Sequence, residues 1–194
     1  ATMSRYDYLR NCHAKMSQVL ETLNDDNQIA IVKVYEEEKK QRNCVDFNDM
    51  LIHVLHLFQN DPELLTYYQD QYPFIFVDEY QDTNAIQYEL IALLAKRYQN
   101  IVVVGDFDQN IYSWRGANIQ NILNFEKDYP NAHTIKLEQN YRSTQTILDA
   151  ANTVIGHNHN RKEKQLWTEN GQGEPITWRH YSDDRSEATD IAKQ

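Results

Sequence analysis

Two short apolar runs, each followed by acidic residues, dominate the hydrophobic pattern of the chain. Residues 74–79 read Phe-Ile-Phe-Val-Asp-Glu, and residues 101–106 read Ile-Val-Val-Val-Gly-Asp. A continuous run of four apolar residues is typical of a strand that is buried on both faces. Between the runs, Asn84 and Gln87 have the spacing of a capping box and precede a helix with one apolar side. A strand, a helix and a strand within about thirty residues predict a right-handed parallel crossover unit, and hence an α/β fold.

The residues before the first run follow helical patterns. Residues 6–23 and 28–42 are mostly polar, and the narrow apolar stripe predicts that these two helices lean on another part of the protein. The charged run 36–40 (Glu-Glu-Glu-Lys-Lys) is expected to be a solvated helix face. Asp46 is expected to cap an apolar helix, and Asp61, followed by proline, is expected to open a further short helix.

Beyond the second run the pattern predicts three more elements. A helix is expected near residues 119–125, a strand that extends the sheet near 134–137, and a helix over 144–155 that Gly156 ends. The polar tail beyond His157 is expected to be a loop that leads into a second domain.

Composition excludes several classes of protein and gives mixed signals about partners. The 194 residues suffice for one domain or two small ones, and no stretch approaches the ~18 consecutive apolar residues of a membrane span. The net charge of −10 argues mildly against nucleic acid as a partner, because non-specific binders usually carry a basic surface. Residues 61–108 carry nine acidic and two basic side chains, which suggests a divalent metal or a solvated acidic face. Cys12 and Cys44 have neither metal-type nor redox-type spacing and no apolar signal core begins the chain, so a cytoplasmic location is expected.

The acidic residues after the two runs lie where chemistry is expected. In open parallel sheets, ligands bind outside the carboxyl ends of the strands. A nucleotide-hydrolysing motor needs an aspartate that holds Mg²⁺ and a carboxylate that polarises the attacking water, and Asp78 followed by Glu79 fits that order. A metal-dependent nuclease built on Asp78, Glu79, Asp106 and Asp108 remains an alternative. A non-enzymatic module that binds DNA or a protein partner is a second alternative.

Three longer motifs carry a resemblance to a known family. They are VDEYQDTN at 77–84, VVGDFDQNIYSWRGA at 103–117 and LEQNYRST at 137–144. In order and spacing they resemble motor motifs of superfamily 1 DNA helicases of the UvrD/PcrA/Rep group, and the flanking segments, 161–162 among them, look especially like the PcrA branch. The resemblance implies RecA-like motor domains with preceding accessory helices, in an ATP-dependent 3′–5′ DNA helicase of DNA repair or replication. It also implies ATP and Mg²⁺ as cofactors and single-stranded or duplex-junction DNA as partner, in a monomer without a membrane anchor.

The same resemblance implies roles for five residues at a nucleotide site. Asp78 would serve Mg²⁺, Glu79 would serve the hydrolytic water, and Gln109 would sense the γ-phosphate through its amide. Arg142 would reach the γ-phosphate from across a domain boundary, and Tyr141 would stack on the adenine.

A contact with single-stranded DNA is implied for Tyr112, Trp114 and Arg115. Aromatic faces take unpaired bases whatever their sequence, so the affinity need not come from a basic surface. The competing interpretation is that Trp114 is a buried anchor of the sheet edge, because tryptophan is usually mostly buried. Asn110 departs from the serine that the family more commonly has at this position.

One motif of a complete motor is missing from the sequence. The phosphate-binding loop ends in Gly-Lys-Ser/Thr, whereas the five glycines of this chain are followed by Asp, Ala, His, Gln and Glu. We therefore expect an internal helicase fragment that is inactive alone and that works with the rest of the helicase chain. Residues 1–45 are expected to end a helical accessory subdomain, 46–140 to form the C-terminal half of the first motor domain, and 141–194 to begin the second.

Overall fold

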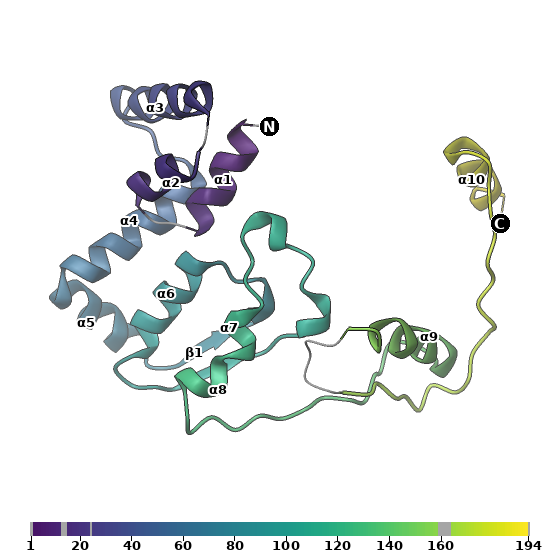
Figure 1. The fold of residues 1–194 in the computed structure, drawn as a ribbon. Helices are drawn as coiled ribbons and strands as arrows, with labels where there is room; N and C mark the ends of the chain where they lie inside the picture. The colour runs from purple at the N-terminus through teal and green to yellow at the C-terminus, as the bar shows by residue number, and fades with distance from the viewer. Residues whose placement is uncertain (1, 13–14, 24, 159–163, 194) are drawn as a thin grey trace. The chain divides into compact units, whose positions relative to one another are not determined.

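The computed structural model describes residues 2–12, 15–23, 25–158 and 164–193, so residues 161–162 of the family resemblance lie outside the described residues. The chain divides into two compact units, Ala1–Ala132 and His133–Gln194, and each is described by itself (Figure 1).

A two-stranded parallel sheet lies at the centre of the first unit. Strands β1 (Ile75–Val77) and β2 (Ile101–Val103) pair with Phe76 opposite Val102. Helix α6 (Ala85–Ala95) connects the two strands and packs against β1 (Figure 1). The strand–helix–strand unit and the α/β fold class are therefore confirmed.

The sheet is less extensive than the pattern predicts. Phe76 is 74% exposed, so the prediction of strands buried on both faces is wrong; alternate side chains point to opposite faces, and α6 packs on the sheet from one side. The prediction of a strand over 134–137 is also wrong, since these residues form no strand and Ile135 and Leu137 are exposed. The segment belongs to the second unit and not to the sheet of the first.

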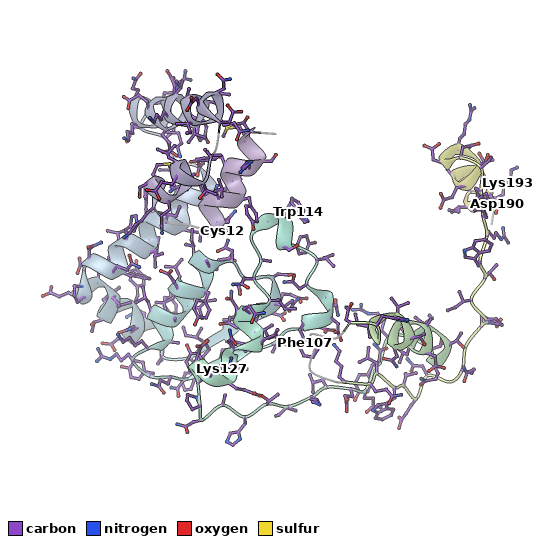
Figure 2. The ribbon with its side chains drawn as sticks, in the orientation of Figure 1. Cys12, Phe107, Trp114, Lys127, Asp190 and Lys193 are labelled. Carbon is purple, nitrogen blue, oxygen red and sulfur yellow. The ribbon has the colours of Figure 1, made fainter. Side chains whose placement is uncertain are left out.

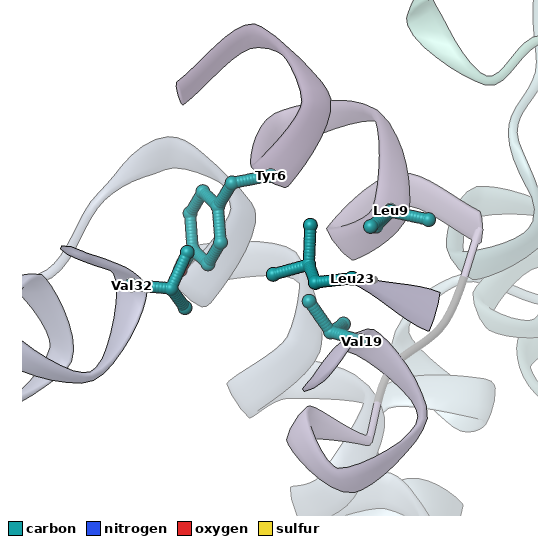
Figure 3. Packing of buried hydrophobic residues seen from close by; sticks show 5 residues of the cluster. All are labelled: Tyr6, Leu9, Val19, Leu23 and Val32. Carbon is teal, nitrogen blue, oxygen red and sulfur yellow. The ribbon is translucent and has the colours of Figure 1, made fainter. Parts of the chain in front are cut away.

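Three helices before the sheet have a core of their own. They are α1 (Thr2–Cys12), α2 (Met16–Thr22) and α3 (Asp26–Gln41). The prediction of one helix over 6–23 is therefore wrong, because two helices cover that range. The buried cluster shown in Figure 3 consists of Tyr6, Leu9, Val19, Leu23 and Val32. Each helix contributes a narrow apolar stripe, and the stripes pack on one another. The prediction that these helices lean on another part of the protein holds for α1, which also packs against α4 and α6.

Two further helices lie between this bundle and α6. Helix α4 (Phe47–Asn60) begins with the predicted cap, in which the Asp46 side chain and the Asp49 side chain bond each other's backbone N–H. Helix α5 (Pro62–Gln71) begins after the predicted Asp61 cap. A small core between α4 and α6 contains Ile52, Leu55 and Ile86.

The run 36–40 is exposed as predicted at Glu37, Glu38 and Lys40, but Lys39 is an exception. This residue is only 8% exposed, and its Nζ lies 2.8 Å from Asp46 Oδ2 and 2.7 Å from Asp49 Oδ2. Arg10 from α1 bonds the other oxygen of Asp49 at 3.0 Å. Burial by itself would raise the pKa of Asp49, but the hydrogen bonds from Lys39 and from the Asp46 backbone lower it overall. A buried charge network thus ties α1 and α3 to the start of α4.

After β2 the chain forms four short helical turns. They are η2 (Phe107–Gln109), η3 (Ser113–Arg115), α7 (Gln120–Leu123) and α8 (Phe125–Asp128). The helix predicted near 119–125 is therefore divided into two.

The second unit contains two helices among its described residues, 133–158 and 164–193. Helix α9 (Gln145–Ile155) ends before Gly156 as predicted, and α10 (Asp184–Ile191) lies in the polar tail. In the parts of the chain that the structure describes, no helix has both the length and the apolar character needed to cross a membrane.

Candidate functional site

The ends of β1 and β2 form one edge at which the two acidic loops begin. The ladder continues past the strands, because Val104 N donates to Val77 O at 2.8 Å and Tyr80 N donates to Val104 O at 2.9 Å. The loops that start at Asp78 and at Gly105 therefore leave the sheet side by side. This confirms the expectation that both lie at the carboxyl end of the sheet.

Glu79 adopts a backbone conformation that non-glycine residues rarely have. Its φ is +50°, in the left-handed region, and its N–H donates to Asp78 Oδ1 at 2.9 Å. Left-handed backbone at a residue with a side chain is unfavourable by about 1–3 kcal/mol and is concentrated at functional sites. The turn leaves the side chains of both Asp78 and Glu79 exposed at the end of the sheet.

A cleft of about 400 Å³ lies beside these two carboxylates. It is lined by Val77, Asp78, Glu79, Asp82, Thr83, Gln87, Leu90 and Ile91. One or two carboxylates together with phosphate oxygens are the ligand set that Mg²⁺ usually takes from a nucleotide-binding protein. The exposed pair at the mouth of the cleft fits that requirement.

The four acidic residues of the nuclease alternative do not form a metal cluster. Within residues 2–12, 15–23, 25–158 and 164–193, no group of three or more His, Cys, Asp or Glu side chains is arranged to hold a metal ion. Asp106 instead serves its own loop, since its Oδ1 accepts from Asp108 N at 3.0 Å and its Oδ2 accepts from Gln109 Nε2 at 2.9 Å.

Gln81 joins the two loops, and its side chain is 1% exposed. Its Nε2 donates to Glu79 Oε2 at 2.7 Å, and its Oε1 accepts from Asp106 N at 2.9 Å. A longer bond of 3.4 Å runs from Nε2 to Asp82 Oδ2. Burial and the nearby Glu79 charge raise the pKa of the Asp82 carboxyl, and the bond from Gln81 opposes this rise.

Gln109 is exposed within η2, directly after the second strand end. The bond to Asp106 uses one of the two hydrogens on its amide nitrogen. The side chain is thereby oriented by its own loop and retains a second hydrogen for another acceptor.

The aromatic loop, residues 111–115, follows η2 and is exposed at each position (Figure 2). Trp114 is 63% exposed, so the interpretation of a buried anchor is wrong. The ring centroids of Tyr112 and Trp114 lie 6.4 Å apart, and the Arg115 guanidinium carbon lies 4.6 Å from the Trp114 ring and 5.7 Å from the Tyr112 ring. Such cation–π contacts are worth about 0.5–1 kcal/mol at exposed sites, and they hold the three side chains together.

The base of this loop rests on helix α1. Gly116 has a φ of +87°, and a Cβ added there would lie 2.9 Å from the Cβ of Asn11. Only glycine suits both the conformation and the close approach. In Figure 2 the loop carrying Trp114 lies beside Cys12, the last residue of α1, in agreement with the contact between η3 and α1.

Tyr141 and Arg142 belong to the second unit. Both side chains are exposed, and the Tyr141 hydroxyl donates to Gln139 Oε1 at 2.9 Å. The backbone N–H of Arg142 donates to Asn140 Oδ1 at 2.9 Å, which fixes the turn before α9. The hydrogen bond to Asn140 thus holds the backbone of this turn and leaves both side chains exposed.

Sequence reasoning missed the part that Gln81 plays. The residue lies inside the motif at 77–84, but a glutamine two positions after an acidic pair carries no signal of burial. Asn110, noted only as a departure from serine, donates through Nδ2 to the Gln81 carbonyl oxygen at 2.5 Å. Only the fold brings these two polar side chains together.

Comparisons with known proteins agree with the motifs. The family model of the UvrD/REP helicase N-terminal domain matches residues 5–130, and that of the UvrD-like helicase C-terminal domain matches residues 135–194. The chain is 56% identical over 161 residues to the ATP-dependent DNA helicase PcrA of Leuconostoc citreum, a match that covers 83% of this chain and 22% of that protein. It is 52% identical over 160 residues to the ATP-dependent DNA helicase PcrA of Staphylococcus aureus strain Mu50, covering 82% of this chain and 22% of that protein. The chain thus spans about a fifth of the length of these relatives.

Proposed function

This chain belongs to the UvrD/REP helicase family, and we propose that the full-length protein is an ATP-dependent DNA helicase. It hydrolyses ATP, moves 3′ to 5′ along single-stranded DNA and separates the strands of a duplex. The observation that carries the proposal is the strand-end arrangement, in which Gln81 links the loop of Asp78 and Glu79 to the loop of Gln109. The exposed aromatic residue Trp114 follows Gln109 by five positions.

The carboxylates beside the cleft act on the nucleotide and on water. Asp78 would hold Mg²⁺, which would supply positive charge beside the phosphate groups. Glu79 accepts a proton from the attacking water, a task for which an exposed carboxylate oriented by a single amide donor is suited. Gln109 donates its remaining amide hydrogen to a γ-phosphate oxygen.

Two residues of the second unit are proposed to bind the nucleotide, on the strength of the family motif at 137–144. Tyr141 stacks on the adenine, since its exposed ring offers a flat apolar face. Arg142 binds γ-phosphate oxygens through its guanidinium fork and stabilises the charge of the transition state.

Single-stranded DNA binds at the aromatic loop. Bases stack on Tyr112 and Trp114, and Arg115 adds positive charge beside the phosphates. Base–aromatic stacking contributes about 1–3 kcal/mol per base, so a chain with a net charge of −10 can still bind DNA.

The 194-residue chain alone does not turn over ATP, because it contains no Gly-Lys-Ser/Thr phosphate loop. Phosphoryl transfer depends almost entirely on positioning and charge stabilisation, which that loop supplies. Phosphate release by the purified chain, measured with single-stranded DNA against a Glu79→Gln control, is expected to equal the control. Release well above the control would contradict this part of the proposal.

The test of the full-length protein is strand separation. A fluorescently labelled duplex with a 3′ single-stranded tail should be unwound when ATP and Mg²⁺ are both present, and a duplex with only a 5′ tail should remain intact. Absence of unwinding on both substrates, by protein that binds the tails, would refute the proposed function.

A further inference from the structure

We propose that Gln81 is a positioning residue through which the DNA-contacting loop controls the orientation of Glu79. In this arrangement, single-stranded DNA bound at Tyr112 and Trp114 fixes the loop after β2, and Gln81 passes that restraint to the Glu79 carboxylate. The inference rests on the proposed function, and it assigns DNA stimulation of ATP hydrolysis to one buried side chain.

The first argument is that the Gln81 side chain has one allowed orientation. Its Nε2 donates to Glu79 and to Asp82, and its Oε1 accepts from the backbone N–H of Asp106. Turning the amide over would place its NH₂ group against the Asp106 N–H and its oxygen against two carboxylates. At 1% exposure no solvent can compensate for those losses. A shift of the Asp106 backbone therefore moves the Gln81 amide group, whose Nε2 donates to Glu79.

The second argument is a separate attachment through the backbone. Asn110 Nδ2 donates to the Gln81 carbonyl oxygen at 2.5 Å, and Asn110 stands two residues before Tyr112. The loop after β2 thus holds Gln81 at two points, by its side chain at Asp106 and by its main chain at Asn110. The aromatic loop begins directly after the second of these points.

The third argument is the space left at Gly105. A Cβ added there would lie 2.6 Å from Gln81 Oε1 and 3.2 Å from Tyr80 N. The two loops are therefore in direct contact, so a movement of one loop displaces the other. Glu79, by contrast, is exposed and receives its side-chain bond from Gln81, so this donor decides where its carboxylate points.

The rival interpretation is that Gln81 only fills a buried polar position. A structural role of this kind predicts lower stability, and a rate of ATP hydrolysis that falls by the same factor with and without DNA. Coupling through Gln81 predicts a lower stimulation ratio, which is the rate of ATP hydrolysis with DNA divided by the rate without it. The ratio falls because the restraint that DNA adds no longer reaches Glu79.

The experiment compares four variants of the full-length protein. Gln81→Glu keeps the shape and the acceptor for Asp106 but removes the donor to Glu79, and Asn110→Ala removes the backbone attachment. Asn110→Ser retains a hydroxyl donor, and Gln120→Glu makes the matched change at an exposed position of α7. ATP hydrolysis is measured with and without saturating oligothymidylate, together with the KM for ATP and the melting temperature.

Gln81→Glu is expected to lose about tenfold or more of the DNA-stimulated kcat with little change in the KM for ATP. Two neighbouring carboxylates favour protonation of the new carboxyl, which can then donate, so the stimulation ratio of Gln81→Glu relative to wild type should rise as the pH is lowered. Asn110→Ala should lower the stimulation ratio, and Asn110→Ser and Gln120→Glu should keep it.

Wild-type stimulation ratios in both Gln81→Glu and Asn110→Ala would overturn the coupling and leave the proposed function intact. If Gln81→Glu does not fold, the ratio of Asn110→Ala decides alone. A wild-type protein whose ATP hydrolysis does not respond to DNA would overturn the proposed function and the coupling with it.

Discussion

Truncating Trp114 to alanine separates a contact with DNA from a contribution to folding. The indole is 63% exposed, and Arg115 holds it beside Tyr112. The substitution removes the largest exposed ring of the loop and leaves the strand ends and the cleft untouched. Affinity for single-stranded DNA should therefore change more than stability or nucleotide binding does.

The magnitudes follow from the exposed fraction. An aromatic side chain buries up to about 250 Å² when fully covered, so the covered third of Trp114 amounts to roughly 90 Å². At about 25 cal/mol per Å² the loss of stability is at most about 2 kcal/mol, against about 3–5 kcal/mol for a fully buried tryptophan. Loss of one stacked base is worth about 1–3 kcal/mol, which corresponds to roughly a 5- to 150-fold weaker Kd.

The assay measures melting temperature and oligothymidylate affinity on the same full-length Trp114→Ala protein. Trp178→Ala is the matched control, since Trp178 is also exposed and stands outside the motif at 103–117. The control should bind DNA like wild type. A large fall in melting temperature with unchanged affinity per folded molecule would refute the reasoning about Trp114.

Four other substitutions test the site and the charge network. Glu79→Gln should abolish turnover and keep Mg·ATP binding, whereas Asp78→Asn should weaken metal binding as well; nucleotide titrations that find equal losses of affinity would remove the distinction between the two carboxylates. Lys39→Met should destabilise the fold by about 3–5 kcal/mol in urea unfolding, because it removes the cation that pairs with the buried Asp49 carboxylate. The control Lys40→Met, at an exposed position, should change the free energy of unfolding little. Equal effects of the two substitutions would contradict a buried network. Asp49 has a lowered pKa in the folded state, so its contribution to stability is complete above its unfolded value of 3.8 and is lost as the pH falls through its folded pKa. Unfolding free energies measured down to pH 2 should therefore decline less steeply in Asp49→Asn, and equal slopes would show that this carboxylate does not matter.

The caps and the strand ends could be predicted from the sequence because they depend on neighbouring residues. A capping box needs only the spacing of Asp46 and Asp49, and a short apolar run before Asp78 is enough to end a strand at an acidic pair. The family motifs then placed Asp78, Glu79 and Gln109 on the loops after these strands.

What the sequence did not reveal depends on residues far apart in the chain. Lys39 looks like part of a solvated charge run until α1 and α4 place Tyr6 and Asp49 around it. Gln81 lies against the second loop where Gly105 allows the two loops to approach within contact distance. Hydrophobic periodicity describes one element at a time, so it cannot register a polar side chain that is buried by two others.

The most direct test of the central claim is the rate of phosphate release by the full-length protein with and without oligothymidylate. The account predicts hydrolysis that single-stranded DNA stimulates in the wild type and that Glu79→Gln abolishes under both conditions. A Glu79→Gln protein that keeps the DNA-stimulated rate of the wild type would contradict the assignment of the chemistry to this end of the sheet.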